Sequence, residues 1–117
     1  MNLSRVDEKT TVRELVEIVA RFRDSRHWRK YDTPRNLVDS ICIEAAELLE
    51  HFQWKSDAQA TEMLKSSEKL SEISNELADV MIYCLGFSDI LRIDVSNAIQ
   101  RKLQKNAGKY PVQEHKI

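Results

Sequence analysis

Apolar residues recur at helical spacing along four segments of the chain. The segments predicted as helices are 12–28, 34–54, 68–91 and 95–108. In each of them hydrophobic side chains fall three or four residues apart, which is the period of an amphipathic helix. No segment alternates polar and apolar residues over a convincing length, so we expect no strand. The pattern therefore predicts an all-α fold.

Capping residues mark where three of these helices begin. Thr11 with Glu14 three positions later is the signature of a capping box, and Asp94 is a favourable N-cap for the last helix. Thr33 is followed by Pro34, which puts a proline at the first helical position, where its missing N–H would have had no partner in the helix. These residues fix the predicted starts of the first, second and fourth helices.

The segments between and around the helices set the limits of a single domain. A chain of 117 residues suffices for one domain. Residues 55–67 are polar and Ser-rich, which predicts a loop with a short helical turn at 61–65. Pro111 prevents the last helix from continuing. We therefore expect a domain over 11–111, an N-terminal extension over 1–10 and a C-terminal tail over 112–117.

Composition and charge exclude several classes of function. The chain has 18 Lys and Arg against 19 Asp and Glu, so it lacks the basic excess of a nucleic-acid-binding protein. Its 2 glycines cannot form a Gly-rich phosphate loop. The longest apolar run, residues 80–87, is too short to span a membrane, and the charged N-terminus is not a signal peptide. The 2 cysteines lie in apolar helical patterns, typical of reduced thiols in a cytoplasmic protein.

Two acidic motifs stand out within the second and third helices. They are Glu44-x-x-Glu47 and Glu76-x-x-Asp79. Helical positions three apart project from one side, and in both motifs the first acid borders the apolar stripe. If the two helices pack antiparallel through these stripes, all four carboxylates meet at one edge of the contact.

Four carboxylates at one place predict a cation site. Such groups raise one another's pKa unless a positive charge lies among them, and a purely carboxylate site suits Mg²⁺, or Mn²⁺, better than Zn²⁺. The alternative is that the acids simply belong to solvated helix faces. A di-iron bundle requires Glu-x-x-His motifs, and no histidine of the chain has a glutamate three positions before it.

Two further sets of residues suit a nucleotide. Lys102, Lys105, Asn106 and Lys109 share one face of the last helix, as a polyphosphate site requires, although a basic helix end is also favoured by the helix dipole alone. Aromatic rings near the acids and helix ends are able to stack a nucleobase, or else belong to the core. They are Trp28, Tyr31, Trp54 and Tyr83, of which Trp54 is predicted on the same side of its helix as the acids.

Together these segments resemble the MazG-type all-α nucleoside triphosphate pyrophosphohydrolases, and more narrowly their dCTP pyrophosphatase branch. The segments are WRKYDTPRN (28–36), EAAELLEHFQWK (44–55), ELADVMIY (76–83) and KLQKNAGKYP (102–111). The resemblance covers about residues 12–111. It implies a MazG fold similar to a four-helix bundle, working as a homo-oligomer, either a tetramer or a dimer, in which a neighbouring chain completes the pocket.

The resemblance also implies roles for individual residues. The implied Mg²⁺ ligands are Glu44, Glu47, Glu76 and Asp79. The implied contacts to base and sugar are Trp28, Tyr31, Asp32, Trp54 and Tyr83. The implied contacts to the triphosphate are Lys102, Asn106, Lys109 and Tyr110. Val19 and Asp32 stand where the cytosine-preferring animal members have histidine, so the metal chemistry carries over better than the base preference.

The expected activity is hydrolysis of a (deoxy)nucleoside triphosphate between its α- and β-phosphates, releasing the monophosphate and pyrophosphate. A dCTP-like or non-standard nucleotide is the expected substrate, with no nucleic-acid or membrane partner. Glu47 is expected nearest the attacking water, with Glu50 assisting it. Two alternatives stay open at this point: a non-catalytic helical module that oligomerises, and a nucleotide sensor without turnover.

Overall fold

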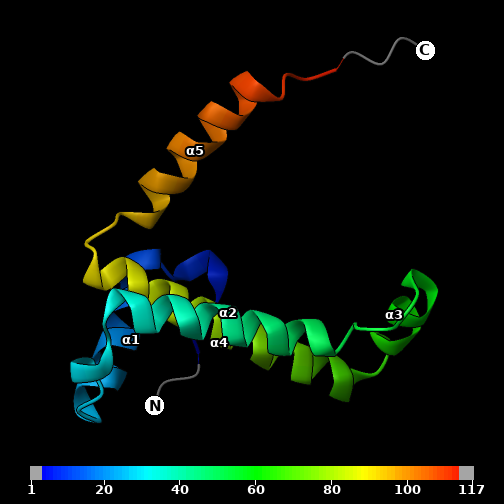
Figure 1. Cartoon of the computed structure of the whole chain (residues 1–117), viewed down its shortest axis with the longest axis horizontal. Helices are drawn as coiled ribbons and strands as arrows, with labels where there is room; N and C mark the ends of the chain where they lie inside the picture. Colours follow the sequence, from blue (N-terminus) through cyan, green and yellow to red (C-terminus); the bar gives the residue numbers. More distant parts are fainter. Residues whose placement is uncertain (1–3, 114–117) are drawn as a thin grey trace.

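The computed structural model describes residues 4–113, and within that range it contains five α-helices and no strand. The α-helices are α1 (Val12–Ser25), α2 (Pro34–Glu50), α3 (Asp57–Met63), α4 (Ser67–Ile90) and α5 (Val95–Lys109) (Figure 1). Two short 3₁₀ helices lie at Asp7–Lys9 and Arg29–Tyr31. The predicted all-α class is confirmed.

The predicted helix starts are confirmed by their caps. At the start of α1, the Thr11 hydroxyl accepts a hydrogen bond from the Glu14 N–H, and the Glu14 carboxylate accepts one from the Thr11 N–H. The Thr33 and Asp94 side chains each accept a hydrogen bond from the backbone N–H three residues on. These bonds satisfy N–H groups that have no partner inside the helix.

Two predicted helix ends are wrong. The first helix ends at Ser25 instead of Trp28, and the second ends at Glu50 instead of Trp54. Soon after each end a non-glycine residue takes a left-handed backbone, with φ of 57° at His27 and 67° at Trp54. Glycine is the usual sequence sign of such a helix end. Neither turn contains a glycine. The spacing of apolar residues continues beyond Ser25 and Glu50, and it therefore predicted helices that are too long.

The segment between the second and third predicted helices is more ordered than expected. It contains α3, which begins before the predicted turn at 61–65 and is started by a capping box between Ser56 and Gln59. The predicted N-terminal extension contains the first 3₁₀ helix. Residues 1–3 of that extension and 114–117 of the predicted tail lie outside the described residues.

The helices form an open arrangement built on one antiparallel pair. The chain runs out along α2, turns through α3 and returns along α4, so that α2 and α4 lie side by side (Figure 1). The first helix, α1, packs against α4 near the end of that pair opposite α3. The last helix, α5, leaves the end of α4 and extends away from the pair (Figure 1).

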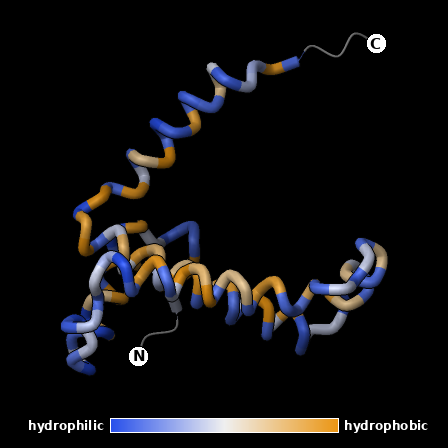
Figure 2. The backbone as a smooth tube through the Cα atoms, in the orientation of Figure 1, coloured by the Kyte–Doolittle hydropathy of each residue, from blue (hydrophilic) through white to orange (hydrophobic). Residues whose placement is uncertain are grey.

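The buried core is small and leaves much apolar surface uncovered. Val16, Leu37 and Leu85 are buried where α1, α2 and α4 meet. Hydrophobic residues nevertheless recur along the whole of α2 and α4 and on one side of α5 (Figure 2). The accessible surface is 9788 Å², against about 6,600 Å² for a compact monomer of this mass. The radius of gyration is 17.7 Å, against about 13 Å for a compact domain of this length.

The described residues include no helix that is both long and apolar enough to cross a membrane.

Candidate functional site

The antiparallel packing of α2 and α4 brings acidic residues of both helices together. One carboxylate oxygen from each of Glu44, Glu47 and Glu76 lies within 4.8 Å of the other two. The fourth predicted ligand, Asp79, is not one of this close group, but its charge raises the pKa of both Glu44 and Glu76. We call these four residues the acid cluster.

The acid cluster is electrostatically unsatisfied. The Oε2 atoms of Glu44 and Glu76 are buried and have no hydrogen-bond partner. The pKa of Glu44 is raised to about 7, first by burial and then by the neighbouring carboxylates. Burial and the same neighbours raise the pKa of Glu76, while nearby His51 lowers it. None of the ion pairs found within residues 4–113 includes a member of the cluster.

The donor set of the acid cluster fits a divalent cation. Buried carboxylate oxygens without partners cost free energy, and so does the mutual repulsion that raises their pKa values. A cation held among the oxygens would remove both costs. Carboxylate oxygens without nitrogen or sulfur donors are ligands preferred by Mg²⁺ and Mn²⁺.

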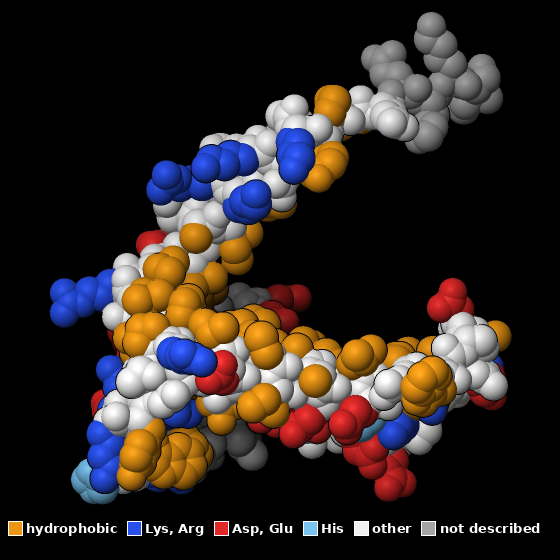
Figure 3. Space-filling view, in the orientation of Figure 1, with side chains coloured by type: hydrophobic (Ala, Val, Ile, Leu, Met, Phe, Trp, Pro, Cys, Tyr) orange, Lys and Arg blue, Asp and Glu red, His pale blue; other side chains and the backbone are white. Residues whose placement is uncertain are grey.

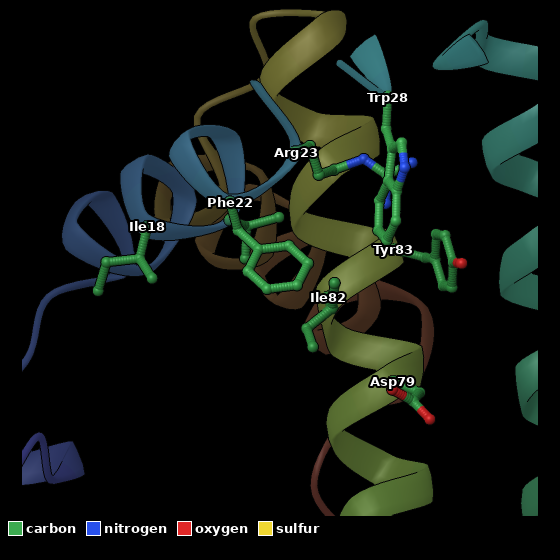
Figure 4. A pocket seen from close by; sticks show the side chains of 8 residues that line it. Ile18, Phe22, Arg23, Trp28, Asp79, Ile82 and Tyr83 are labelled. Atoms are coloured by element: carbon green, nitrogen blue, oxygen red, sulfur yellow. The ribbon is translucent and has the colours of Figure 1, made fainter. Parts of the chain in front are cut away.

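A cavity of about 370 Å³ adjoins the acid cluster, within the size range of small-molecule sites. Asp79 is the member of the acid cluster that lines the cavity, whereas Glu44, Glu47 and Glu76 are outside its lining. Figure 4 shows Arg23 reaching from α1 toward the rings of Trp28 and Tyr83, with Asp79 further along α4. The full lining is Ile18, Val19, Phe22, Arg23, Trp28, Asp79, Ile82 and Tyr83. The cavity is therefore mostly apolar and aromatic, with one cation and one acid.

An ion pair with Asp32 fixes the position of Arg23 in this cavity. Arg23 donates from Nε to Asp32 Oδ2 at 2.6 Å, and its Nη2 donates to Asp32 Oδ1. The Arg23 guanidinium carbon lies 5.8 Å from the centroid of the Trp28 ring and 5.5 Å from that of Tyr83. Asp32 itself is buried and is not part of the cavity lining.

Several residues predicted at the site lie apart from the acid cluster in a single chain. Tyr31 and Trp54 are 60% and 92% exposed and do not line the cavity. Trp54 follows the end of α2, so the prediction that it shares a helix face with the acids is wrong. Glu50 is exposed at the last position of α2 and is not one of the close group of carboxylates.

The predicted phosphate contacts are carried by α5, away from the acid cluster. Lys102 and Lys109 lie on α5, and Tyr110 follows its last residue; all three are exposed, and Asn106 is half-buried. Basic side chains gather on the outer side of α5, while its hydrophobic side faces the open space between α5 and the α2–α4 pair (Figure 3). One chain alone therefore does not bring these residues to the acids.

The sequence reasoning missed Arg23 as a cavity residue. A charged residue four positions after Val19 and one after Phe22 interrupts the apolar stripe of the first helix. Such an interruption indicates either a solvated edge or a buried pair, and only the position of Asp32 distinguishes the two. His51, whose charge acts on Glu76, was also not anticipated.

Comparisons with known proteins agree on one family. The family model described as the MazG-like family matches residues 40–117. The chain is 32% identical to dCTP pyrophosphatase 1 of Rattus norvegicus over 102 residues, which cover 87% of this chain and 60% of that protein. It is 32% identical to the Homo sapiens protein of the same name over 101 residues, covering 86% and 59%. The chain thus spans about 60% of the length of these curated relatives.

A solved structure supports the same assignment. The crystal structure of a pyrophosphatase from Archaeoglobus fulgidus matches with a TM-score of 0.81 and 44% sequence identity. The match covers 92% of this chain and 100% of that one.

Proposed function

The chain belongs to the MazG-like family, and from that membership we propose that it hydrolyses a (deoxy)nucleoside triphosphate to the monophosphate and pyrophosphate in a Mg²⁺-dependent reaction. The observation that carries this proposal is the approach of the Glu44, Glu47 and Glu76 carboxylates within 4.8 Å, beside an aromatic cavity. The names of the dCTP pyrophosphatase relatives support a dCTP-like or non-standard nucleotide as the substrate.

In the proposed reaction the acid cluster holds Mg²⁺, or Mn²⁺. When bound, the cation supplies positive charge to the phosphate oxygens and makes a neighbouring water more acidic. Glu47 accepts a proton from the attacking water, and Glu50, one helical turn further on, assists it. The water oxygen forms a bond to the α-phosphorus, the bond between that phosphorus and the bridging oxygen breaks, and pyrophosphate leaves with the bridging oxygen.

The cavity takes the nucleoside part of the substrate. Trp28 and Tyr83 line it with aromatic rings, on which a base is able to stack. Asp79 lies in the lining as well as in the acid cluster, which supports adjoining positions for the base and the phosphates. Tyr31 and Trp54 keep their proposed roles as further contacts to base and sugar, although neither lines the cavity of its own chain. Asp32 is buried outside the cavity lining and is not proposed as a direct contact.

The complete site requires a second copy of the chain. The proposed triphosphate contacts are Lys102, Asn106, Lys109 and Tyr110. Because α5 extends away from the acids of its own chain (Figure 1), we place these residues at the site of a neighbouring copy. The uncovered apolar surface of α2, α4 and α5 supports a homo-oligomer. The family resemblance favours a tetramer over a dimer. The free cysteines support a cytoplasmic location.

Pyrophosphate release from dCTP in the presence of Mg²⁺ tests the proposal. Glu47→Gln and Asp79→Asn should each slow release by about 100-fold or more, as removal of an electrostatic stabiliser does. Glu72→Gln is the matched control, since Glu72 lies on α4 but pairs with Lys69. Undiminished release in both cluster variants would overturn the proposed site.

The products and a substrate panel refine the assignment. Orthophosphate with a nucleoside diphosphate would mean that the wrong bond was assigned. Nucleotide binding without any product would favour the sensor alternative. Assay of several triphosphates then identifies the preferred base and sugar.

A further inference from the structure

We infer that the Arg23–Asp32 ion pair positions the nucleoside part of the substrate, with Arg23 as a fixed cation in the cavity wall and Asp32 acting through it. The inference rests on the proposed function insofar as the cavity takes a nucleoside. It changes the role of Asp32 from a direct contact with base or sugar to the residue that holds Arg23 in place.

The pair is buried and joins two separate elements. Arg23 lies on α1, and Asp32 follows the 3₁₀ helix Arg29–Tyr31, immediately before the cap of α2. Their side chains are 12% and 3% exposed. Two parallel N–H···O bonds fix the plane of the guanidinium, which a single contact would not do.

Arg23 has more hydrogen-bond donors at the cavity than Asp32 engages. The hydrogen bond to Asp32 raises the pKa of Arg23 most, and the neighbouring Tyr83 side chain helps to raise it. A guanidinium has five N–H groups, and Asp32 accepts from two nitrogens, Nε and Nη2. Arg23 lines the cavity, whereas Asp32 does not. The remaining donors suit the carbonyl and ring-nitrogen acceptors of a nucleobase. The guanidinium lies within cation–π range of Trp28 and Tyr83, the two rings proposed to contact the base.

A purely structural role explains this arrangement less well. Desolvating two charges costs free energy, and replacing a buried ion pair by well-packed apolar residues is often neutral or stabilising. The neighbouring lining residues Ile18, Phe22 and Ile82 are apolar, so another apolar residue at position 23 would suit the packing. Among the residues that line the cavity, Arg23 is the one cation.

The double variant Arg23→Met with Asp32→Asn tests the inference. It removes both charges at similar volume, so neither residue is left as a buried unpaired ion. The KM for dCTP should rise about 10- to 100-fold, the range expected for lost hydrogen bonds to a charged group. The kcat should change by no more than about threefold, because loss of binding that is equal in the ground state and the transition state leaves kcat unchanged. Inhibition by pyrophosphate, which has no nucleoside, should be unchanged.

Two further variants separate position from charge. Asp32→Asn alone keeps the Arg23 charge but no longer fixes the position of its guanidinium. This variant should raise KM by an intermediate factor. Arg5→Met with Glu14→Gln is the matched control, because it removes an exposed arginine–carboxylate pair that joins the N-terminal segment to α1 and lies outside the cavity. Glutamine retains the capping box at position 14. This control should leave KM unchanged.

Two results would overturn the inference. A lower melting temperature with unchanged KM would make the pair structural only. An equal loss of pyrophosphate inhibition would show that the effect is not confined to the nucleoside.

A fluorescence titration keeps the inference separate from the proposed function. Trp28 and the exposed Trp54 are the two tryptophans of the chain. Deoxycytidine should quench tryptophan fluorescence in the parent protein but not in the double variant. Quenching of this kind without any pyrophosphate release would contradict the proposed function and still support the inference. Absence of quenching in the parent would overturn the inference.

Discussion

The two ends of the α2–α4 pair have similar side chains but opposite burial. At the closed end, Leu37 of α2 and Leu85 of α4 are buried with Val16 of α1. At the open end, toward α3, Leu49 of α2 and Leu77 of α4 are 59% and 52% exposed. The difference lies in what covers the leucines, since α1 packs against the closed end and no long helix of the described chain packs against the open end.

The acid cluster, at 44–47 of α2 and 76–79 of α4, lies along the same stretch of the two helices as the exposed leucines of the open end. The closed end provides the aromatic cavity, to which α1 and α4 contribute lining residues. The open end has a shallow hollow of about 440 Å³ whose residues are apolar. They are Ala45, Leu48, Leu49, Phe52, Ile73 and Leu77. Apolar surface of this kind marks the place where we expect another copy to pack.

The largest predicted effect compares one substitution at the two ends. Leu37→Ala should lower the free energy of unfolding by about 2–5 kcal/mol, because it leaves a cavity in a closed core. The matched Leu49→Ala should cost little at low protein concentration and more at high concentration, because oligomer formation stabilises by mass action. Urea denaturation at two protein concentrations measures both. Equal costs that do not depend on concentration would remove the distinction between the ends.

Much of this fold was predictable because helices have fixed geometry. The phase of Glu44, Glu47 and Glu76 on two helices was enough to place them together once antiparallel packing was assumed. Caps such as Thr11 and Asp94 fixed helix starts, since each bond is local in the sequence.

The rest depends on connections that the residue pattern does not determine. The Arg23–Asp32 pair depends on the left-handed turn at His27, and the direction of α5 depends on a similar turn at Arg92, with φ of 54°. Neither residue is a glycine, so neither turn is marked in the sequence. The exposure of Trp54 likewise follows from a backbone turn and not from its side chain.

The second prediction concerns how the stability of the metal-free fold depends on pH through the acid cluster. A carboxyl whose folded pKa is raised binds its proton more tightly in the folded state than in the unfolded state. For Glu44, with an ordinary pKa of 4.5 and a folded pKa of about 7, the metal-free fold should therefore lose stability as pH rises from about 5 to about 8. Thermal melting across this range measures the loss.

Added Mg²⁺ should reverse this trend. At a concentration of 100 times its Kd it should stabilise the fold by about 2.7 kcal/mol. The gain should be greater at pH 8 than at pH 5, because protons compete with the cation for the same oxygens. Glu44→Gln should weaken both the pH dependence and the Mg²⁺ response, whereas Glu72→Gln should preserve them. A Mg²⁺ response that persists in full without the Glu44 carboxylate would contradict the assignment of Glu44 as a ligand.

The smallest predicted effect tests whether the open side of one chain is completed by another. The Glu47→Gln chain has an altered acid cluster and an intact α5. The chain with Lys102→Ala and Lys109→Ala has an intact acid cluster and an altered α5. If α5 serves the site of a neighbouring copy, mixed oligomers contain sites with both parts intact. An equal mixture allowed to exchange subunits should then recover about a quarter of wild-type pyrophosphate release, since half of the pairs are mixed and each has one intact site of two.

A mixture of two acid-cluster variants is the control for this recovery. Glu47→Gln mixed with Asp79→Asn should stay inactive, because every site then lacks one carboxylate of the same α2–α4 pair. Recovery in this control would mean that the acids of one site come from different chains, contrary to the distances within a single chain. No recovery with the lysine variant, in oligomers shown to exchange, would mean that α5 folds back onto its own acids. The open end would then be closed by the chain itself, and the contrast between the two ends would be a matter of conformation and not of assembly.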